Sequence, residues 1–169
     1  MRFRTVYIGV GSNLGDRKAI LEEGIALLER ELVELKSIKS LTEAPIYETQ
    51  AWGMPEGTPA FLNLVVAIDT DLELEDLLRL LLEVEKGCGR KRGESKGYSD
   101  RTLDLDILLD GDTILKTLEL EVPHPRMLER RFVLKPLSDL DSEMKIPGIK
   151  ISVGEALEVC PKKPEVRLF

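Results

Sequence analysis

Residues 101–109, RTLDLDILL, alternate between polar and apolar side chains at the period of a β-strand, and no other segment restricts the fold as strongly. Alternate residues of a strand project from opposite faces of its sheet. One face therefore carries two carboxylates, those of Asp104 and Asp106. The opposite face carries only apolar side chains, from Leu103, Leu105, Ile107 and Leu109. The segment predicts a strand that buries this apolar face in a core.

The two carboxylates also indicate a chemistry. Two carboxylates that are separated by one residue on a strand lie about 6–7 Å apart at Cα. They repel each other unless a cation bridges them. Mg²⁺ binds one or two carboxylates together with substrate phosphates, and arginine, here Arg101, is the usual partner of phosphate oxygens. The pattern indicates a Mg²⁺–nucleotide site, although alternating Asp and Leu is also typical of a half-exposed strand with a solvated face.

The composition is that of a soluble globular chain. A length of 169 residues favours one domain, residues 1–169, and we expect a monomer. No uninterrupted apolar stretch approaches the roughly 18 residues of a membrane span, and the N-terminus has no signal-peptide pattern. Cys88 and Cys160 form no metal motif, so we expect free thiols and a cytoplasmic location. The net charge of −7 argues against nucleic acid as a partner.

Basic residues are concentrated in two segments, 86–101 and 126–135, of this acidic chain. The first contains four glycines and immediately precedes the strand with the two aspartates. Short basic segments indicate a local anion site rather than a long polyanion track. A solvated basic loop would have the same composition, so both interpretations remain open.

The order of expected elements predicts a ferredoxin-like fold. Strands are expected at 5–10, 35–47, 61–69 and 102–110, and helices at 16–32 and 73–88. This β-α-β-β-α-β order belongs to the α+β class, with an antiparallel sheet and both helices packed on one face. Pro45 interrupts the second strand. A C-terminal extension follows, with a helix at 129–137 and a mostly irregular tail.

Two smaller motifs have open roles. Gly9, Gly11 and Gly15 lack the spacing of a dinucleotide-binding fingerprint, and no Gly-Lys-Ser/Thr follows, so a tight turn is their expected use. His124, the only histidine, lies between two prolines. It could donate a hydrogen bond to a phosphate oxygen or serve the structure alone.

A possible acceptor pocket follows the second strand, at a loop rich in glycine and proline. Trp52, Phe61 and Phe132 could stack a flat heterocycle, or could pack in the core. Asn63 could read an amide-like edge, because its side chain both donates and accepts. A carboxylate pair, a basic loop and a separate pocket are the parts that phosphoryl transfer needs.

Six segments occur in the order seen in one known family: YIGVGSNLGD (7–16), IYET (46–49), FLN (61–63), GRKR (89–92), RTLDLDILL (101–109) and VPHPRMLERRFVLKPL (122–137). Together they resemble the 2-amino-4-hydroxy-6-hydroxymethyldihydropteridine pyrophosphokinase family of folate biosynthesis. The resemblance implies transfer of the diphosphate of ATP to the hydroxymethyl group of 6-hydroxymethyl-7,8-dihydropterin, with release of AMP. It also implies two Mg²⁺ ions and ATP as co-substrate.

The resemblance implies a role for each residue at a matching position. Asp104 and Asp106 would hold the metal ions and, with Arg90 and Arg101, form the catalytic set. The ATP-binding set would be Glu85, Arg90, Arg92, Tyr98, Arg101, Ile107, His124 and Arg130. The pterin-binding set would be Thr49, Ala51, Trp52, Phe61, Asn63 and Phe132.

The chain departs from the family pattern in three places. The basic loop that holds Arg92 and Tyr98 is about one residue longer than in some relatives, which affects the matching of these two positions. Tyr98 keeps an aromatic face near a position where the family often has tryptophan. Glu119 and Glu121 stand where some members have arginine and threonine near the nucleotide, so those two contacts are not carried over.

Two rival functions belong to other classes. Ferredoxin-like sheets include RNA-recognition domains, but the net charge and the lack of an aromatic RNP pattern count against RNA binding. A Mg²⁺-dependent nucleotide hydrolase would release phosphate or diphosphate from ATP without any pterin.

Overall fold

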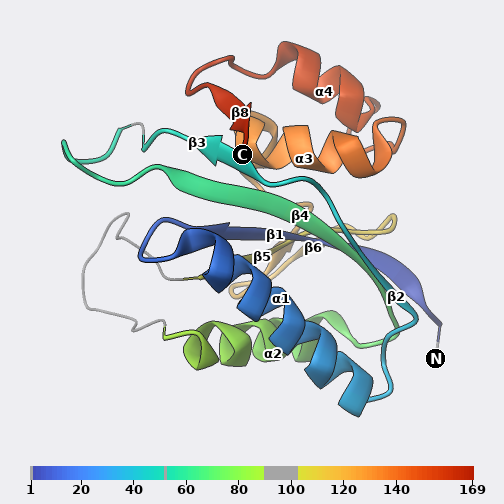
Figure 1. Ribbon diagram of the computed structural model, residues 1–169. Helices are drawn as coiled ribbons and strands as arrows, with labels where there is room; N and C mark the ends of the chain where they lie inside the picture. The colour runs from blue at the N-terminus through green and yellow to red at the C-terminus, as the bar shows by residue number, and fades with distance from the viewer. Residues whose placement is uncertain (1, 52, 90–102) are drawn as a thin grey trace.

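An antiparallel sheet lies between two pairs of helices (Figure 1). The computed structural model describes residues 2–51, 53–89 and 103–169. Its helices and strands are β1 (Arg4–Ser12), α1 (Arg17–Glu34), β2 (Ser40–Glu43), β3 (Tyr47–Thr49), β4 (Phe61–Thr70), α2 (Leu74–Gly87), β5 (Asp104–Asp110), β6 (Leu115–Lys116), β7 (Glu121–Val122), the 3₁₀ helix η1 (Met127–Glu129), α3 (Arg131–Asp141), α4 (Val153–Val159) and β8 (Val166–Leu168).

The central sheet has the strand order β5-β1-β4-β3-β8, and β2 also pairs with β4. Every pairing in this sheet is antiparallel. β2 and β3 lie one after the other along β4, where they pair with residues 66–69 and 61–63. Together they form the second strand of the β-α-β-β-α-β core, so the predicted ferredoxin-like α+β fold is confirmed.

The predicted second strand, residues 35–47, is wrong in its bounds. Leu35 caps α1, and Lys36 has a left-handed φ of 57°, so the chain turns here before β2 begins at Ser40. Pro45 has no N–H to donate, and the pairing with β4 stops beside it. The N–H of Ala44 still donates to the carbonyl of Val65 at 2.9 Å, which keeps the interrupted strand against β4.

Each face of the sheet has its own core. α1 and α2 pack on one face, as predicted, over side chains that include Ile8 and Leu64. α3 and α4 cover the opposite face (Figure 1) and share a second core with Val65. Burial of both faces explains why β4, in the middle of the sheet, is apolar on both sides.

The C-terminal extension is more regular than predicted. A capping box starts α4: Ser152 Oγ accepts from the N–H of Glu155 at 3.1 Å, and the Glu155 carboxylate accepts from the N–H of Ser152 at 2.6 Å. β8 then pairs with β3, and the N–H of Phe169 donates to the carbonyl of Ile46. The tail after α3 is mostly irregular, as predicted, but sequence reasoning did not predict α4 and β8 within it.

β5 changes the face of its side chains at a bulge. Ile107 pairs with Ile8, and Leu109 pairs with Tyr7, so Leu108 is the extra residue. Ile107 lies in the core beneath α1 and α2, whereas Leu108 and Leu109 pack in the core beneath α3. The prediction that Leu109 shares the face of Ile107 is wrong for this reason.

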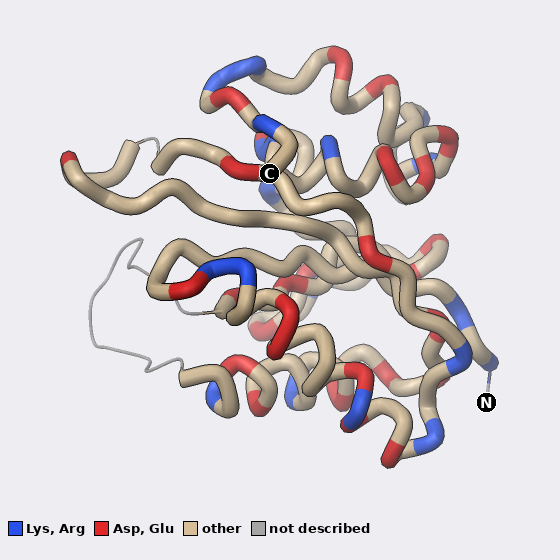
Figure 2. Tube along the Cα trace, viewed as in Figure 1, with Lys and Arg blue, Asp and Glu red and all other residues tan. Residues whose placement is uncertain are grey.

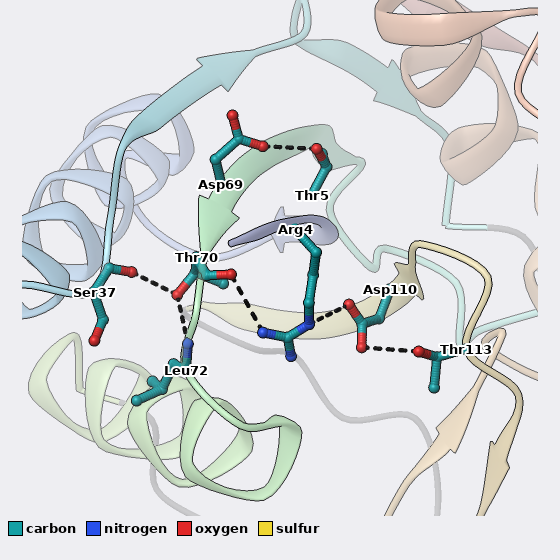
Figure 3. Close-up of polar contacts among 8 residues, drawn as sticks. All are labelled: Arg4, Thr5, Ser37, Asp69, Thr70, Leu72, Asp110 and Thr113. Atoms are coloured by element: carbon teal, nitrogen blue, oxygen red, sulfur yellow. Dashed lines mark hydrogen bonds and ion pairs between the residues drawn. The ribbon is translucent and has the colours of Figure 1, made fainter. Parts of the chain in front are cut away.

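A polar cluster, shown in Figure 3, ties three strands together. By the strand register, it lies at the opposite end of β1 from the partner of Asp104. The guanidinium of Arg4 lies 2.8 Å from the carboxylate of Asp110 and donates to the carbonyl of Thr70 at 3.3 Å. Thr113 donates to the same carboxylate at 3.2 Å. The Asp110 side chain is only 4% exposed, so these bonds replace the water that burial removes.

Charged residues of both signs occur along α1 and α2 (Figure 2). Lys18–Glu22 and Arg79–Asp76 are exposed ion pairs of these helices, and such pairs contribute little stability. Across the three described ranges, no helix combines the length and the apolar character that crossing a membrane requires.

Candidate active site

The two aspartates of β5 project from the sheet face opposite α1 and α2. Their sheet partners on β1 are Gly11 for Asp104 and Gly9 for Asp106. Both carboxylates are half-buried, while the intervening Leu105 points into the core below. The alternation in the sequence thus predicted the placement of the pair correctly.

One row of paired residues crosses the sheet at Asp104. It runs through Gly11 on β1 and Asn63 on β4 to Tyr47 on β3. Paired residues of neighbouring antiparallel strands share a face. A β-carbon added to Gly11 would lie 2.7 Å from Asn63 Oδ1, so the amide leans over β1, in the direction of Asp104.

The residues of the expected pterin pocket that the structure describes lie next to this row. Thr49 and Phe61 are sheet partners, one step along from Tyr47 and Asn63 on the same face. Thr49 is 3% exposed, and its Oγ1 has no hydrogen-bond partner among the described residues. Ala51 is half-buried in the loop that follows β3.

α3 brings Phe132 and Arg130 to the same side of the sheet. α3 packs against β3 and β4, and Phe132 lies in its first turn, half-buried against the second core. The Arg130 guanidinium lies 5.7 Å from the centre of the Phe132 ring, a cation–π contact. The hydrogen bond from the Tyr47 hydroxyl to Asp139 holds α3 on β3. Lys135, which pairs with Asp139 within α3 at 2.9 Å, also lies 5.6 Å from the centre of the Tyr47 ring.

His124 is positioned through its backbone. Its N–H donates at 2.9 Å to the carbonyl of Leu108, the extra residue of the β5 bulge. Its Nδ1 accepts from the backbone N–H of Arg126 at 3.2 Å. The proton of the neutral ring is therefore on Nε2, which makes Nε2 a donor.

The charges around His124 place it at the site. Burial lowers the pKa of His124 below its usual value, and Arg130 and Arg126 lower it further, while Asp104 and Glu121 oppose this shift. The imidazole therefore favours its neutral form. The neutral ring offers one donor, the Nε2–H, between two arginines and an aspartate, where it could meet a phosphate oxygen.

Glu85 is buried near the end of α2. It is 2% exposed, and its Oε1 accepts from the backbone N–H of Leu105 at 2.9 Å. Ile107 is 3% exposed in the core beneath α1 and α2, on the opposite face from the aspartates. Any contact of Ile107 with a nucleotide base would come from its backbone.

The carboxylate pair fits a magnesium site. Within the described part of the chain, no group of three or more His, Cys, Asp or Glu side chains could enclose a metal ion. An all-protein cage is thus absent there, whereas Mg²⁺ needs only one or two carboxylates when phosphates and water complete its shell. Asp104 and Asp106 meet that requirement from one strand.

Comparison with known proteins identifies the family. The profile described as 7,8-dihydro-6-hydroxymethylpterin-pyrophosphokinase (HPPK) matches residues 7–142. Two curated relatives are named 2-amino-4-hydroxy-6-hydroxymethyldihydropteridine pyrophosphokinase. The one from Porphyromonas gingivalis is 40% identical over 137 residues, or 80% of this chain and 89% of its own. The one from Bacillus subtilis is 41% identical over 140 residues, or 82% of this chain and 79% of its own.

The chain belongs to the HPPK family. Its fold also matches a solved structure, the wild-type HPPK-DHPS of Plasmodium falciparum with pteroate, with a TM-score of 0.71 at 12% identity. The match covers 93% of this chain but only 42% of that longer chain. The likeness to that structure supports the fold alone.

Five of the residues that HPPK resemblance assigns to the site lie outside the described residues: Trp52, Arg90, Arg92, Tyr98 and Arg101. Sequence reasoning gave no role to Arg126, whose backbone N–H donates to His124 and whose charge lowers the pKa of that imidazole. It also undervalued Gly11. Alternate glycines inside a strand are a signal of close approach, and here that approach is by Asn63.

Proposed function

We propose that this HPPK family member transfers the diphosphate of ATP to the hydroxymethyl group of 6-hydroxymethyl-7,8-dihydropterin and releases AMP. The single observation that carries the proposal is the row in which Asp104, Gly11 and Asn63 follow one another across three strands. This row offers a cation-binding carboxylate and an amide that can read a heterocycle, with bare backbone between them. Pyrophosphokinase activity in folate biosynthesis is the activity of the family.

Asp104 and Asp106 are the residues that would hold two Mg²⁺ ions. When bound, the ions neutralise phosphate oxygens and polarise the phosphorus under attack. The two carboxylates are held apart by the strand itself, and Glu85 fixes the backbone between them. They therefore need little rearrangement to receive metal and nucleotide together.

His124 and Arg130 would bind the phosphates of ATP from the side of β5 and α3. The Nε2–H of His124 would donate to a phosphate oxygen, and the Arg130 guanidinium would offset its charge. We assign Arg90, Arg92, Tyr98 and Arg101 to the same nucleotide on the family resemblance, with Arg90 and Arg101 acting in catalysis. Glu85 and the backbone of Ile107 complete the proposed nucleotide side.

The pterin would lie on the sheet between β3 and the start of α3. Its ring would stack on Phe61, Phe132 or Trp52, and Asn63 would read its amide edge. Thr49 and Ala51 would line the same pocket. In the reaction, the pterin hydroxyl loses its proton and its oxygen bonds to the β-phosphorus, while the bond from that phosphorus to AMP breaks.

We also propose that residues 1–169 form one catalytic domain that acts as a cytoplasmic monomer. The two cysteines support a reducing compartment, because both are free thiols. Cys88 packs against the core beneath α1 and α2, and Cys160 lies in the core beneath α3, so the sheet separates them.

The test is an assay of AMP formation with ATP and Mg²⁺, with and without the hydroxymethyldihydropterin. We expect AMP and pterin diphosphate in equal amounts, only when the pterin is present. Release of phosphate or diphosphate from ATP without pterin would indicate a hydrolase instead. Asp104→Ala is the matched inactive control, and a filter-binding test with single-stranded RNA addresses the remaining rival.

A further inference from the structure

Gly11 separates the proposed metal-binding carboxylate from the proposed pterin-reading amide. We infer that Gly11 is a positioning residue: its lack of a side chain leaves the room in which the Asn63 amide lies across β1 toward Asp104. The inference rests on the proposed function, because it takes Asn63 as the side chain that reads the pterin.

The register puts the three residues on one face. Gly11 pairs with Asn63 on β4 and with Asp104 on β5. Neighbouring strands lie about 4.8 Å apart, so the backbones of Asn63 and Asp104 are about 10 Å apart with only Gly11 between them. The Asn63 amide occupies the part of this span next to Gly11.

A side chain at Gly11 would fill this space. Its β-carbon would lie 2.7 Å from Asn63 Oδ1 and 3.7 Å from Asn63 Cγ. The first distance is too short for a carbon–oxygen contact, so the amide would have to move. Gly11 is not among the glycines with positive φ, so the backbone itself does not require glycine here.

The collision falls on the end of a rotatable side chain, not on backbone. Gly11→Ala is therefore relieved when the Asn63 amide turns away, and the strand keeps its place. The substitution should leave the fold intact and remove the amide from the position over β1. A glycine that is needed for tight packing of the core would behave differently, because its replacement by alanine would destabilise the fold.

Gly9 provides a matched control on the same strand and the same face. Its β-carbon would lie 3.5 Å from Leu108 Cδ2, an ordinary contact, and it pairs with Val65 instead of Asn63. Gly9→Ala adds the same methyl group and the same change in β-propensity. It does not displace the amide.

The experiment is calorimetric titration of hydroxymethyldihydropterin into the full chain, in the presence of Mg²⁺ and a non-hydrolysable ATP analogue. We expect Gly11→Ala to weaken pterin binding about tenfold or more, the cost of lost hydrogen bonds. Gly9→Ala should stay within about twofold of wild type, and the affinity for the ATP analogue alone should be unchanged in both. Unfolding by urea checks that both variants are folded.

A double-mutant cycle separates positioning from general damage. In an Asn63→Ala background there is no amide to displace, so Gly11→Ala should cause no further loss of pterin affinity. The inference is wrong if Gly11→Ala binds pterin as wild type does. It is also wrong if Gly11→Ala lowers the pterin affinity by the same factor in the wild-type and the Asn63→Ala backgrounds. If wild type binds no pterin at all, the proposed function is wrong, and the inference fails with it.

Discussion

The buried carboxylate of Glu85 accepts a hydrogen bond from the backbone N–H of Leu105 at 2.9 Å. Leu105 lies between Asp104 and Asp106, and β5 is the last strand of the sheet on that side. The bond therefore ties the end of α2 to the backbone that carries both site carboxylates. It also satisfies a buried N–H on this terminal strand, which has no further strand beside it.

Glu85→Ala should destabilise the fold by roughly 1–3 kcal/mol, because it leaves the N–H of Leu105 buried without this acceptor. Glu85→Gln keeps an acceptor oxygen and should lose less stability than Glu85→Ala. Urea unfolding of the two variants measures the difference. Equal stability of Glu85→Ala and wild type would show that the bond to Leu105 does not hold the strand.

Removal of either site carboxylate should abolish most activity with little effect on folding. We expect Asp104→Ala and Asp106→Ala to lower turnover by a factor on the order of 10³, because metal bound to transferred phosphate contributes several kcal/mol. Both side chains are half-buried on the sheet face, so unfolding free energies should change little. Asp112→Ala, at the exposed turn after β5, is the control. Near-normal turnover in either site variant would contradict the metal assignment.

His124 should make stability depend on pH near neutrality. Its pKa in the folded protein lies below its usual value, chiefly through burial, so the unfolded chain binds the proton more readily. Stability is therefore present above the unfolded pKa of about 6.5 and is lost as the pH falls from there toward the folded pKa. Urea unfolding between pH 7.5 and 5.5 measures this loss, and proton NMR can follow the single imidazole directly.

His124→Gln is the control for this pH dependence, because the chain has no other histidine. Its stability should be flat across the same interval, where carboxylates with ordinary pKa values stay ionised. An unchanged slope in this variant would assign the pH dependence to another group.

Gly24→Ala should destabilise the core although it removes a glycine from α1. Its β-carbon would lie 2.6 Å from Leu103 Cδ2, and Leu103 is fully buried. Overpacking costs about 1–3 kcal/mol, which offsets the gain of about 1 kcal/mol in helix propensity. Thermal unfolding measures the net effect of the overpacking and of the improved helix propensity. A higher midpoint than wild type would mean that α1 shifts away from β5 without cost.

The sequence predicted the core of the fold because its local patterns agree with one another. Alternation at Asp104–Ile107 and the capping side chain of Asp16, which accepts from the N–H of Ala19, depend only on near neighbours. The bulge at Leu108 depends on pairing with β1, a segment about a hundred residues away in the chain. No local sequence pattern could therefore predict the bulge.

The site was predictable in part for the same reason. The side chains that face outward, such as Asp104 and Asn63, could be read from spacing and from resemblance to the HPPK family. The burial of Glu85 and the neutral state favoured by His124 come from tertiary contacts. The capping box at Ser152 was in the sequence and could have predicted α4.

The bulge at Leu108 also bears on how this strand can change in evolution. Loss of Leu108 would leave the other pairings of β5 in place, because Ile107 already pairs with Ile8 and Leu109 with Tyr7. A residue lost or gained between Asp104 and Ile107 would instead turn the side chains on one side of the change to the opposite face of the sheet, so an aspartate would enter the apolar core or an apolar side chain would leave it. An insertion in the turn at Gly111 would disturb neither. The segment from Asp104 to Ile107 should therefore tolerate no change in length, while the bulge and the turn beyond it can vary.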